Sequence, residues 1–186
     1  IGGRKIENWD RQAHGVVDMT QILVQSLNVG AATVSLRMGP SDFYNMFRSF
    51  GLGRPTGIDL QGEASGMMFV PGDEDWSESN LGTNAYGQGV AVTPLQMITA
   101  VSAIANDGIM MSPCMIDQVR GADGAKLYEC QPKVFAETIS PATAESLREM
   151  MAMAVIKGTS RKAFRVKRRE ASLRGITIGG KTGSLT

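Results

Sequence analysis

The sequence predicts a mixed α/β (α+β) fold in which helices predominate and strands are few. Several stretches carry apolar residues at helical spacing behind recognisable N-caps. One pair of short β-prone stretches flanks a glycine-bounded turn, and one further extended stretch lies close to the C-terminus. With 186 residues, 42% of them hydrophobic, the chain can bury the core of one domain or of a large part of one.

Three helical segments are expected before residue 51. The first begins at Asp18, with Asp18 or Thr20 as its N-cap and apolar side chains along one face. A second run begins after Asn28 and is interrupted by a Gly-Pro pair. The third covers residues 42–50 and ends at Gly51, because glycine commonly follows the last turn of a helix.

The middle of the chain combines loops with one strongly marked helix. Residues 51–84 are rich in glycine, proline and acidic residues and are expected to form loops, apart from a short strand or extended piece at 58–60. Thr93 then provides the N-cap of a helix, with Pro94 in its first turn and Gln96 three residues after the cap. This pattern is typical of a capping box.

The last third of the chain is expected to hold a hairpin, a helix and a strand. The hairpin joins residues 115–119 to residues 126–129 through a glycine-bounded turn. Ser140 is expected to cap a helix that ends at Gly158. Residues 176–178 begin a strand that continues into a glycine pair.

Two cysteines, Cys114 and Cys130, lie on the two arms of the hairpin, nearly equidistant from its turn. Directly opposed residues on paired strands approach to about 4.5–5.5 Å, a distance that a disulfide can span. A register shift of one residue would turn the two side chains apart. The sequence therefore leaves both a disulfide and two free thiols open.

The net charge of +1 hides an uneven distribution. Residues 161–174 contain seven cations and one anion, whereas the rest of the chain has twelve cations and seventeen anions. This basic segment is expected to be a solvated loop or a patch that faces an anionic partner. The overall balance argues against a nucleic-acid partner. One histidine and two cysteines exclude a Cys/His zinc site, so neither a metal nor a cofactor is expected.

One short motif near the C-terminus suggests carboxylate binding. Lys181, Thr182 and Gly183 follow a glycine pair, and Ser184 comes next. A cation and small hydroxyl residues at a strand edge can bind a carboxylate, and a glycine beside them lets a substrate backbone approach closely.

A second short motif, Ser26-Leu27-Asn28, lies between the first two helical runs. A hydroxyl and an amide two residues apart on a loop can serve as a proton relay and as an anchor for a substrate amide. Taken alone, such residues are usually helix caps.

Together and in this order, the two motifs resemble two of the three motifs of the penicillin-binding protein and serine β-lactamase superfamily. That superfamily combines a Ser-x-x-Lys, a Ser-x-Asn and a Lys-Thr-Gly motif. Segments along almost the whole chain are similar to the transpeptidase domain of class B penicillin-binding proteins. In family order they are Ser26-Leu-Asn-Val-Gly30, Phe50-Gly-Leu-Gly53, Pro55-Thr-Gly-Ile-Asp-Leu60, Tyr86-Gly-Gln-Gly89, Val92-Thr-Pro-Leu-Gln96 and Gly180-Lys-Thr-Gly183.

The resemblance implies a partial β-lactamase/transpeptidase-like fold: mainly the helical lobe, a hairpin and the first active-site strand of an antiparallel sheet. The sequence departs from the family at the first motif, because no serine is followed by a lysine three positions later. Thr159 and Lys162 have that spacing, but they follow Ser26 and are in the wrong order. Residues 1–186 are therefore expected to be a partial transpeptidase domain, lacking the upstream Ser-x-x-Lys segment and the strands after the Lys-Thr-Gly strand.

The resemblance also implies a role for each residue of the two motifs. Ser26 would relay a proton to the leaving amine, Asn28 would hold the substrate's amide carbonyl, and Lys181 would maintain the proton network and the positive potential. The terminal carboxylate of the substrate would be bound by the group Thr182, Gly183 and Ser184. The backbone N–H of Ser184 would be one of two oxyanion donors.

The activity that the resemblance implies is that of a peptidoglycan D,D-transpeptidase, which forms a serine acyl-enzyme. Its partners would be a D-Ala-D-Ala stem peptide, β-lactams and other cell-wall synthesis proteins. It would act in the periplasm, at the extracytoplasmic face of the bacterial inner membrane, held only by an N-terminal anchor outside this sequence. The chain alone is expected to be inactive. A β-lactamase, a D,D-carboxypeptidase and a non-catalytic sensor or scaffold remain alternatives.

Overall fold

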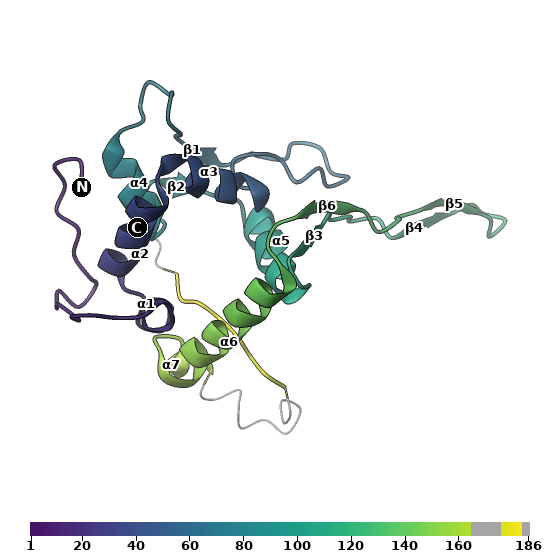
Figure 1. The fold of residues 1–186 in the computed structure, drawn as a ribbon. Helices are drawn as coiled ribbons and strands as arrows, with labels where there is room; N and C mark the ends of the chain where they lie inside the picture. The colour runs from purple at the N-terminus through teal and green to yellow at the C-terminus, as the bar shows by residue number, and fades with distance from the viewer. Residues whose placement is uncertain (165–175, 184–186) are drawn as a thin grey trace.

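The computed structural model describes residues 1–164 and 176–183, which form helices and short antiparallel strand pairs (Figure 1). The helices are α1 (Met19–Gln25), α2 (Asn28–Met38), α3 (Pro40–Ser49), α4 (Glu78–Asn84), α5 (Pro94–Ala105), α6 (Pro141–Lys157) and α7 (Arg161–Phe164). The strands are β1 (Met67–Met68), β2 (Val90–Ala91), β3 (Ile109–Met111), β4 (Gln118–Arg120), β5 (Lys126–Glu129) and β6 (Val134–Glu137). The expected mixture of predominant helices with few strands is confirmed.

The three N-terminal helices form where the local signals predict them. Asp18 caps α1, since its side chain accepts from the Gln21 N–H while the Gln21 side chain accepts from the Asp18 N–H. Helix α3 begins at Pro40, two residues earlier than expected, because proline fits the first turn of a helix. Gly51 follows the C-cap of α3 with φ +73°, a conformation that favours glycine, as predicted.

The hydrophobic core lies where α3 meets α4 and the segment leading into α4. Phe43, Tyr44 and Leu81 are buried there. Partly buried side chains pack around them: Phe47, Met68, Val70, Trp76 and Ala85. The Tyr44 hydroxyl accepts from Trp76 Nε1 (3.0 Å) and from Asn84 Nδ2 (3.1 Å), so the core also contains a buried polar network.

Of the short strand or extended piece expected at residues 58–60, no strand is formed, and the chain bends at Asp59 and Leu60. Asp59 instead uses its carboxylate to accept the backbone N–H groups of Met115 (2.6 Å) and Ile116 (3.1 Å) at the base of the hairpin. This side-chain contact joins the two segments without a strand ladder. The prediction of loops as far as residue 84 is also incomplete, because β1 and α4 lie within that stretch.

Gln96, in the first turn of α5, is fully buried and holds a neighbouring loop in place. Its Nε2 donates to the carbonyl oxygens of Arg54 and Ser65, at 2.8 Å each. Its Oε1 accepts the Thr93 N–H (2.8 Å), which completes the predicted capping box. One side chain therefore both caps α5 and anchors the two ends of the loop between residues 54 and 65.

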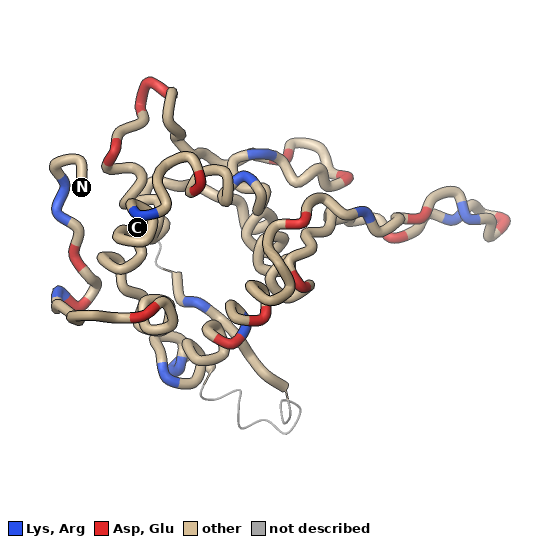
Figure 2. The backbone as a smooth tube through the Cα atoms, viewed as in Figure 1, with Lys and Arg blue, Asp and Glu red and all other residues tan. Residues whose placement is uncertain are grey.

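The predicted hairpin is present and is the outer part of a longer two-stranded arm (Figure 1). Strand β3 pairs with β6, and β4 pairs with β5 further out. Cationic and anionic residues alternate along the outer part (Figure 2). Cys114 and Cys130 form a disulfide between the two strand pairs. The Cys130 N–H donates to the Asp117 carbonyl (2.8 Å), so the bridge does not join directly opposed residues of the ladder.

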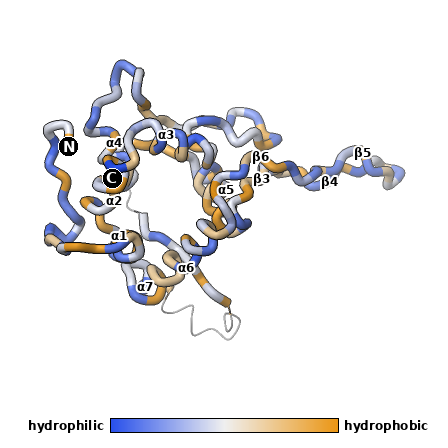
Figure 3. Tube along the Cα trace, viewed as in Figure 1, coloured by the Kyte–Doolittle hydropathy of each residue, from blue (hydrophilic) through white to orange (hydrophobic). Residues whose placement is uncertain are grey.

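Helix α6 is central to the arrangement, because α1, α5 and α7 all contact it. Ser140 caps it by accepting the Thr143 N–H, and Gly158 follows its last residue, as predicted. Hydrophobic residues line its neighbour α5 and the following strand β3 (Figure 3).

The strand expected to begin at residues 176–178, which the resemblance identifies as the first active-site strand, is not formed within residues 176–183. Residues 176–183 have no strand partner in the described part of the chain and pass alongside α6 instead. A strand requires a neighbour to complete its ladder of backbone hydrogen bonds, whatever its local sequence favours.

The buried position of Gln96 leads to a stability prediction. Gln96→Leu would leave two carbonyl groups and one N–H without their partner, so we expect the free energy of unfolding to fall by about 2–4 kcal/mol. Urea unfolding followed by circular dichroism measures this change. The control Gln61→Leu, in an exposed loop, should change the stability by less than about 0.5 kcal/mol. Equal effects of the two substitutions would contradict the anchoring role of Gln96.

Candidate functional site

Ser26 lies in the tight connection between α1 and α2. It is the C-cap of α1 and has φ +57°, ψ +52°, a left-handed conformation that is uncommon for residues other than glycine. Its N–H donates to the Leu23 carbonyl (3.3 Å), which ends the helix. The next helix begins only two residues later, at Asn28. The backbone therefore presents the Ser26 hydroxyl at the junction of two helices.

Lys181 reaches Ser26 from a segment 155 residues further along the chain. Its Nζ donates to Ser26 Oγ (2.7 Å) and to the carbonyl oxygen of Thr182 (2.8 Å). Although Lys181 as a residue is exposed, its ammonium group is partly withdrawn from water, and this desolvation lowers the pKa of Lys181 below its ordinary value. The two motifs predicted to act together are thus in direct contact.

The segment that carries Lys181 lies close to α6, and Gly179 allows this approach. The Gly180 N–H donates to the Met151 carbonyl (3.1 Å). A Cβ at Gly179 would lie only 3.1 Å from the Cβ of Met151, whereas one at Gly180 would make an ordinary contact with Val155 at 3.5 Å. Because α1 also contacts α6, the same helix supports both Ser26 and Lys181.

Asn28 is held by the polar stretch that precedes α1. Its Nδ2 donates to the Glu7 carbonyl (3.0 Å). Leu27, the N-cap of α2, provides no side-chain hydrogen bond. Asn8 does so instead, since its Oδ1 accepts the Val29 N–H (3.1 Å). The sequence gives no local signal for these contacts, because the partners lie 21 residues apart.

Thr182 contacts Thr159, a residue outside both motifs. Its Oγ1 lies 2.8 Å from Oγ1 of Thr159, in the turn between α6 and α7. Gly183 is exposed beside it. The predicted residue Ser184 lies outside the described residues, as does most of the basic segment 161–174. The structure thus brings Ser26, Lys181 and Thr182 into one network.

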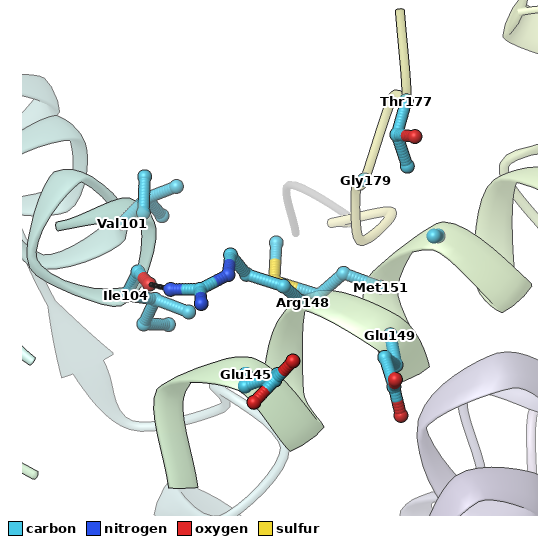
Figure 4. Close-up of a pocket in the computed structure, with 10 residues that line it drawn as sticks. Val101, Ile104, Glu145, Arg148, Glu149, Met151, Thr177 and Gly179 are labelled. Carbon is cyan, nitrogen blue, oxygen red and sulfur yellow. Dashed lines mark hydrogen bonds between the residues drawn. The ribbon is translucent and has the colours of Figure 1, made fainter. Parts of the chain in front are cut away.

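A pocket of about 480 Å³ lies between α5, α6 and residues 177–179 (Figure 4). None of the predicted site residues lines it. The guanidinium group of Arg148 donates to the Ile104 carbonyl (3.0 Å) and pairs with Asp107 (2.8 Å), so this lining side chain is already engaged. The pocket is therefore not the site formed by Ser26 and Lys181.

The described part of the chain contains neither a metal-binding cluster of side chains nor a membrane-spanning helix. No group of histidine, cysteine, aspartate and glutamate side chains there is arranged to hold a metal ion. No helix in residues 1–164 or 176–183 is long and apolar enough to cross a membrane.

Known proteins are similar to this chain in sequence and in fold. The family model described as "Penicillin binding protein transpeptidase domain" matches residues 1–185. Penicillin-binding protein PbpB of Mycolicibacterium smegmatis is 36% identical over 184 residues, covering 94% of this chain and 27% of that protein. Peptidoglycan D,D-transpeptidase FtsI of Escherichia coli is 34% identical over 109 residues, covering 59% of this chain and 18% of that protein. The chain thus spans about a quarter or less of the length of these relatives.

A solved structure extends the similarity to three dimensions. Penicillin-binding protein 3 of Mycobacterium tuberculosis, complexed with aztreonam, superposes with a TM-score of 0.74 at 35% identity, covering 86% of this chain and 35% of that one. The match includes the mixture of helices and small antiparallel strand pairs. Sequence and structure agree that the chain belongs to the penicillin-binding-protein transpeptidase domain family and is related to the peptidoglycan D,D-transpeptidases.

Proposed function

We propose that residues 1–186 are part of a peptidoglycan D,D-transpeptidase that cross-links stem peptides through a serine acyl-enzyme and that β-lactams acylate. The observation that carries this proposal is the 2.7 Å hydrogen bond from Lys181 Nζ to Ser26 Oγ, which joins two of the three family motifs. Solved relatives complexed with aztreonam or ampicillin support the β-lactam part of the proposal.

The hydrogen-bond capacities of the two side chains suit proton relay. An ammonium group only donates, so Ser26 Oγ must be the acceptor in its contact with Lys181. The single proton of the Ser26 hydroxyl is then free to pass to the leaving amine, and Ser26 can regain a proton from the nucleophile. Desolvation lowers the pKa of Lys181 below its ordinary value, which favours proton exchange within this network.

Asn28 and Thr182 supply the proposed substrate contacts. One N–H of the Asn28 amide is held by Glu7, which leaves the second N–H to donate to the amide carbonyl of a stem peptide. Thr182, Gly183 and Ser184 bind the terminal carboxylate, with the positive charge of Lys181 nearby. The Ser184 N–H acts as one oxyanion donor.

The nucleophile comes from sequence outside these residues, because the chain has no Ser-x-x-Lys motif. The complete gene product acts at the extracytoplasmic face of the inner membrane, with other cell-wall synthesis proteins as partners. The 186-residue chain by itself forms no acyl-enzyme.

Labelling with a fluorescent penicillin tests this function. We expect the complete gene product that contains this chain to form a covalent adduct, because its serine opens the β-lactam ring, and we expect prior addition of aztreonam to prevent it. The 186-residue chain should not be labelled. If the complete gene product is not labelled, the protein is a non-catalytic sensor or scaffold. Rapid release of hydrolysed penicillin would instead indicate a β-lactamase.

The relay role of Ser26 leads to a second prediction. In the complete gene product, Ser26→Ala should slow acylation by about 10²-fold or more, because proton transfer in the transition state loses its relay. Stopped-flow measurement of the acylation rate tests this. The control Ser146→Ala removes an exposed hydroxyl from α6 and should leave the rate within about 2-fold of the starting protein. An unchanged rate in Ser26→Ala would remove Ser26 from the mechanism.

The environment of Lys181 leads to a third prediction, for the 186-residue chain. Desolvation lowers the pKa of Lys181, whereas the hydrogen bond to Glu7 raises that of Lys5. NMR titration of the side-chain ammonium groups should therefore find Lys181 losing its proton at lower pH than Lys5. Between the lowered pKa and the unfolded value of about 10.4, the unfolded chain holds more protons, so this group makes stability rise with pH. The reverse order of titration would contradict this account.

A further inference from the structure

We propose that Thr159 is a positioning residue for the carboxylate-binding hydroxyl of Thr182. By donating its own hydroxyl proton to Thr182 Oγ1, Thr159 leaves the Thr182 proton free for the carboxylate of the substrate. This inference rests on the proposed function of the Lys181–Thr182 segment. It concerns a residue outside both motifs that carry the resemblance.

The direct observation is the contact between the two hydroxyl groups. Thr159 Oγ1 and Thr182 Oγ1 lie 2.8 Å apart, although the residues are separated by 23 positions in the sequence. This distance is typical of an O–H···O hydrogen bond. Either oxygen can be the donor, so the geometry alone allows two arrangements of the protons.

Binding of an anion selects one of these arrangements. A threonine hydroxyl has one proton, and a carboxylate can only accept. If Thr182 donated to Thr159, the oxygen of Thr182 would face the carboxylate without a proton and would repel it. With Thr159 as the donor, Thr182 accepts from Thr159 and donates to the ligand. The contact therefore orients the Thr182 hydroxyl towards an anion.

Thr159 is itself held by two helices. Its N–H donates to the Val24 carbonyl (3.3 Å) in α1, two residues before Ser26. The Gly158 N–H donates to the Ala154 carbonyl (3.0 Å) in α6. A Cβ at Gly158 would collide with both of these carbonyl oxygens, so glycine allows the turn to lie this close. Thr159 thus joins α1, α6 and the Lys181–Thr182 segment.

Thr159 and Lys162 have the spacing of the Ser-x-x-Lys motif, but they do not form a pair of that kind. Lys162 is exposed on α7, and the described contacts contain no hydrogen bond between it and Thr159. The Thr159 hydroxyl is directed to Thr182 instead. Thr159 therefore acts through Thr182 and does not form a nucleophile–lysine pair.

Acylation of the complete gene product by benzylpenicillin tests the proposal. Thr159→Val keeps the shape of the side chain and removes the hydroxyl. We expect the second-order acylation constant to fall by about 3- to 10-fold, the effect of one neutral hydrogen bond. The loss should appear in the dissociation constant of the initial complex, with the acylation rate at saturation nearly unchanged. Thr159→Ser keeps the hydroxyl and should restore acylation to within about 2-fold of the starting protein.

Two controls separate positioning from a general structural effect. Thr143→Val removes one hydroxyl of a similar pair, Ser140 with Thr143 (2.9 Å), at the other end of α6, and should leave acylation unchanged. Benzylpenicillin methyl ester lacks the carboxylate, so Thr159→Val should slow its acylation much less than that of benzylpenicillin. Equal slowing of both compounds, or no slowing, would overturn the proposal.

If Thr159→Val does not fold, Thr159→Ala is compared with Thr159→Ser on the same two compounds. Failure of the unsubstituted protein to acylate would instead refute the proposed function.

Discussion

The contact between Lys181 and Ser26 depends on α6, and much of the site depends on that helix. Ser26 follows α1, which contacts α6, and the Lys181 segment is attached to α6 by the Gly180–Met151 hydrogen bond. Residues 155 positions apart are therefore placed by one common support. A rigid helix can hold two side chains at hydrogen-bond distance more accurately than two independent loops can. Disturbing either contact with α6 would separate the motifs without changing the residues that carry the chemistry.

A second support, distant in sequence from the motifs, is built from side-chain to backbone hydrogen bonds. Gln96 holds both ends of the loop at 54–65, and within that loop the Glu63 carboxylate accepts from Thr56 and Gly57. Asp59 then attaches the loop to the hairpin. These contacts satisfy backbone groups that no strand ladder satisfies, which explains how a region with little regular structure can remain ordered. Thr56, Asp59 and Gln96 all lie in segments that resemble the transpeptidase domain.

The sequence predicts contacts between residues close together in the chain, but not contacts between distant ones. The caps at Asp18, Thr93 and Ser140 depend on residues three positions away, and all three were predictable. Asn8 caps α2 from 21 residues away, and the pairing of β3 with β6 joins residues still further apart; neither leaves a local signal. The strand expected to begin at 176–178 was wrongly predicted for the same reason, because a strand forms only with backbone hydrogen bonds to a neighbouring strand, which the local sequence does not reveal. In the site, the resemblance predicted Ser26 and Lys181, whereas the contact between Thr159 and Thr182 is visible only in the structure.

The hydrogen bonds of the site are oriented so that the hydroxyl groups of Ser26 and Thr182 direct their protons towards the ligand. The Lys181 ammonium group donates to Ser26, so this hydrogen bond leaves the Ser26 proton available to another acceptor. In the proposed arrangement Thr159 likewise donates to Thr182. The hydroxyl groups of Ser26 and Thr182 then each accept a hydrogen bond from the protein and can donate one to the ligand. A site arranged in this way favours ligands that present acceptors, such as a carboxylate or a leaving amine that takes up a proton. Reversing either contact would turn an oxygen lone pair towards the ligand. The polarity of the site thus depends on two donors, of which the family motifs contain only Lys181.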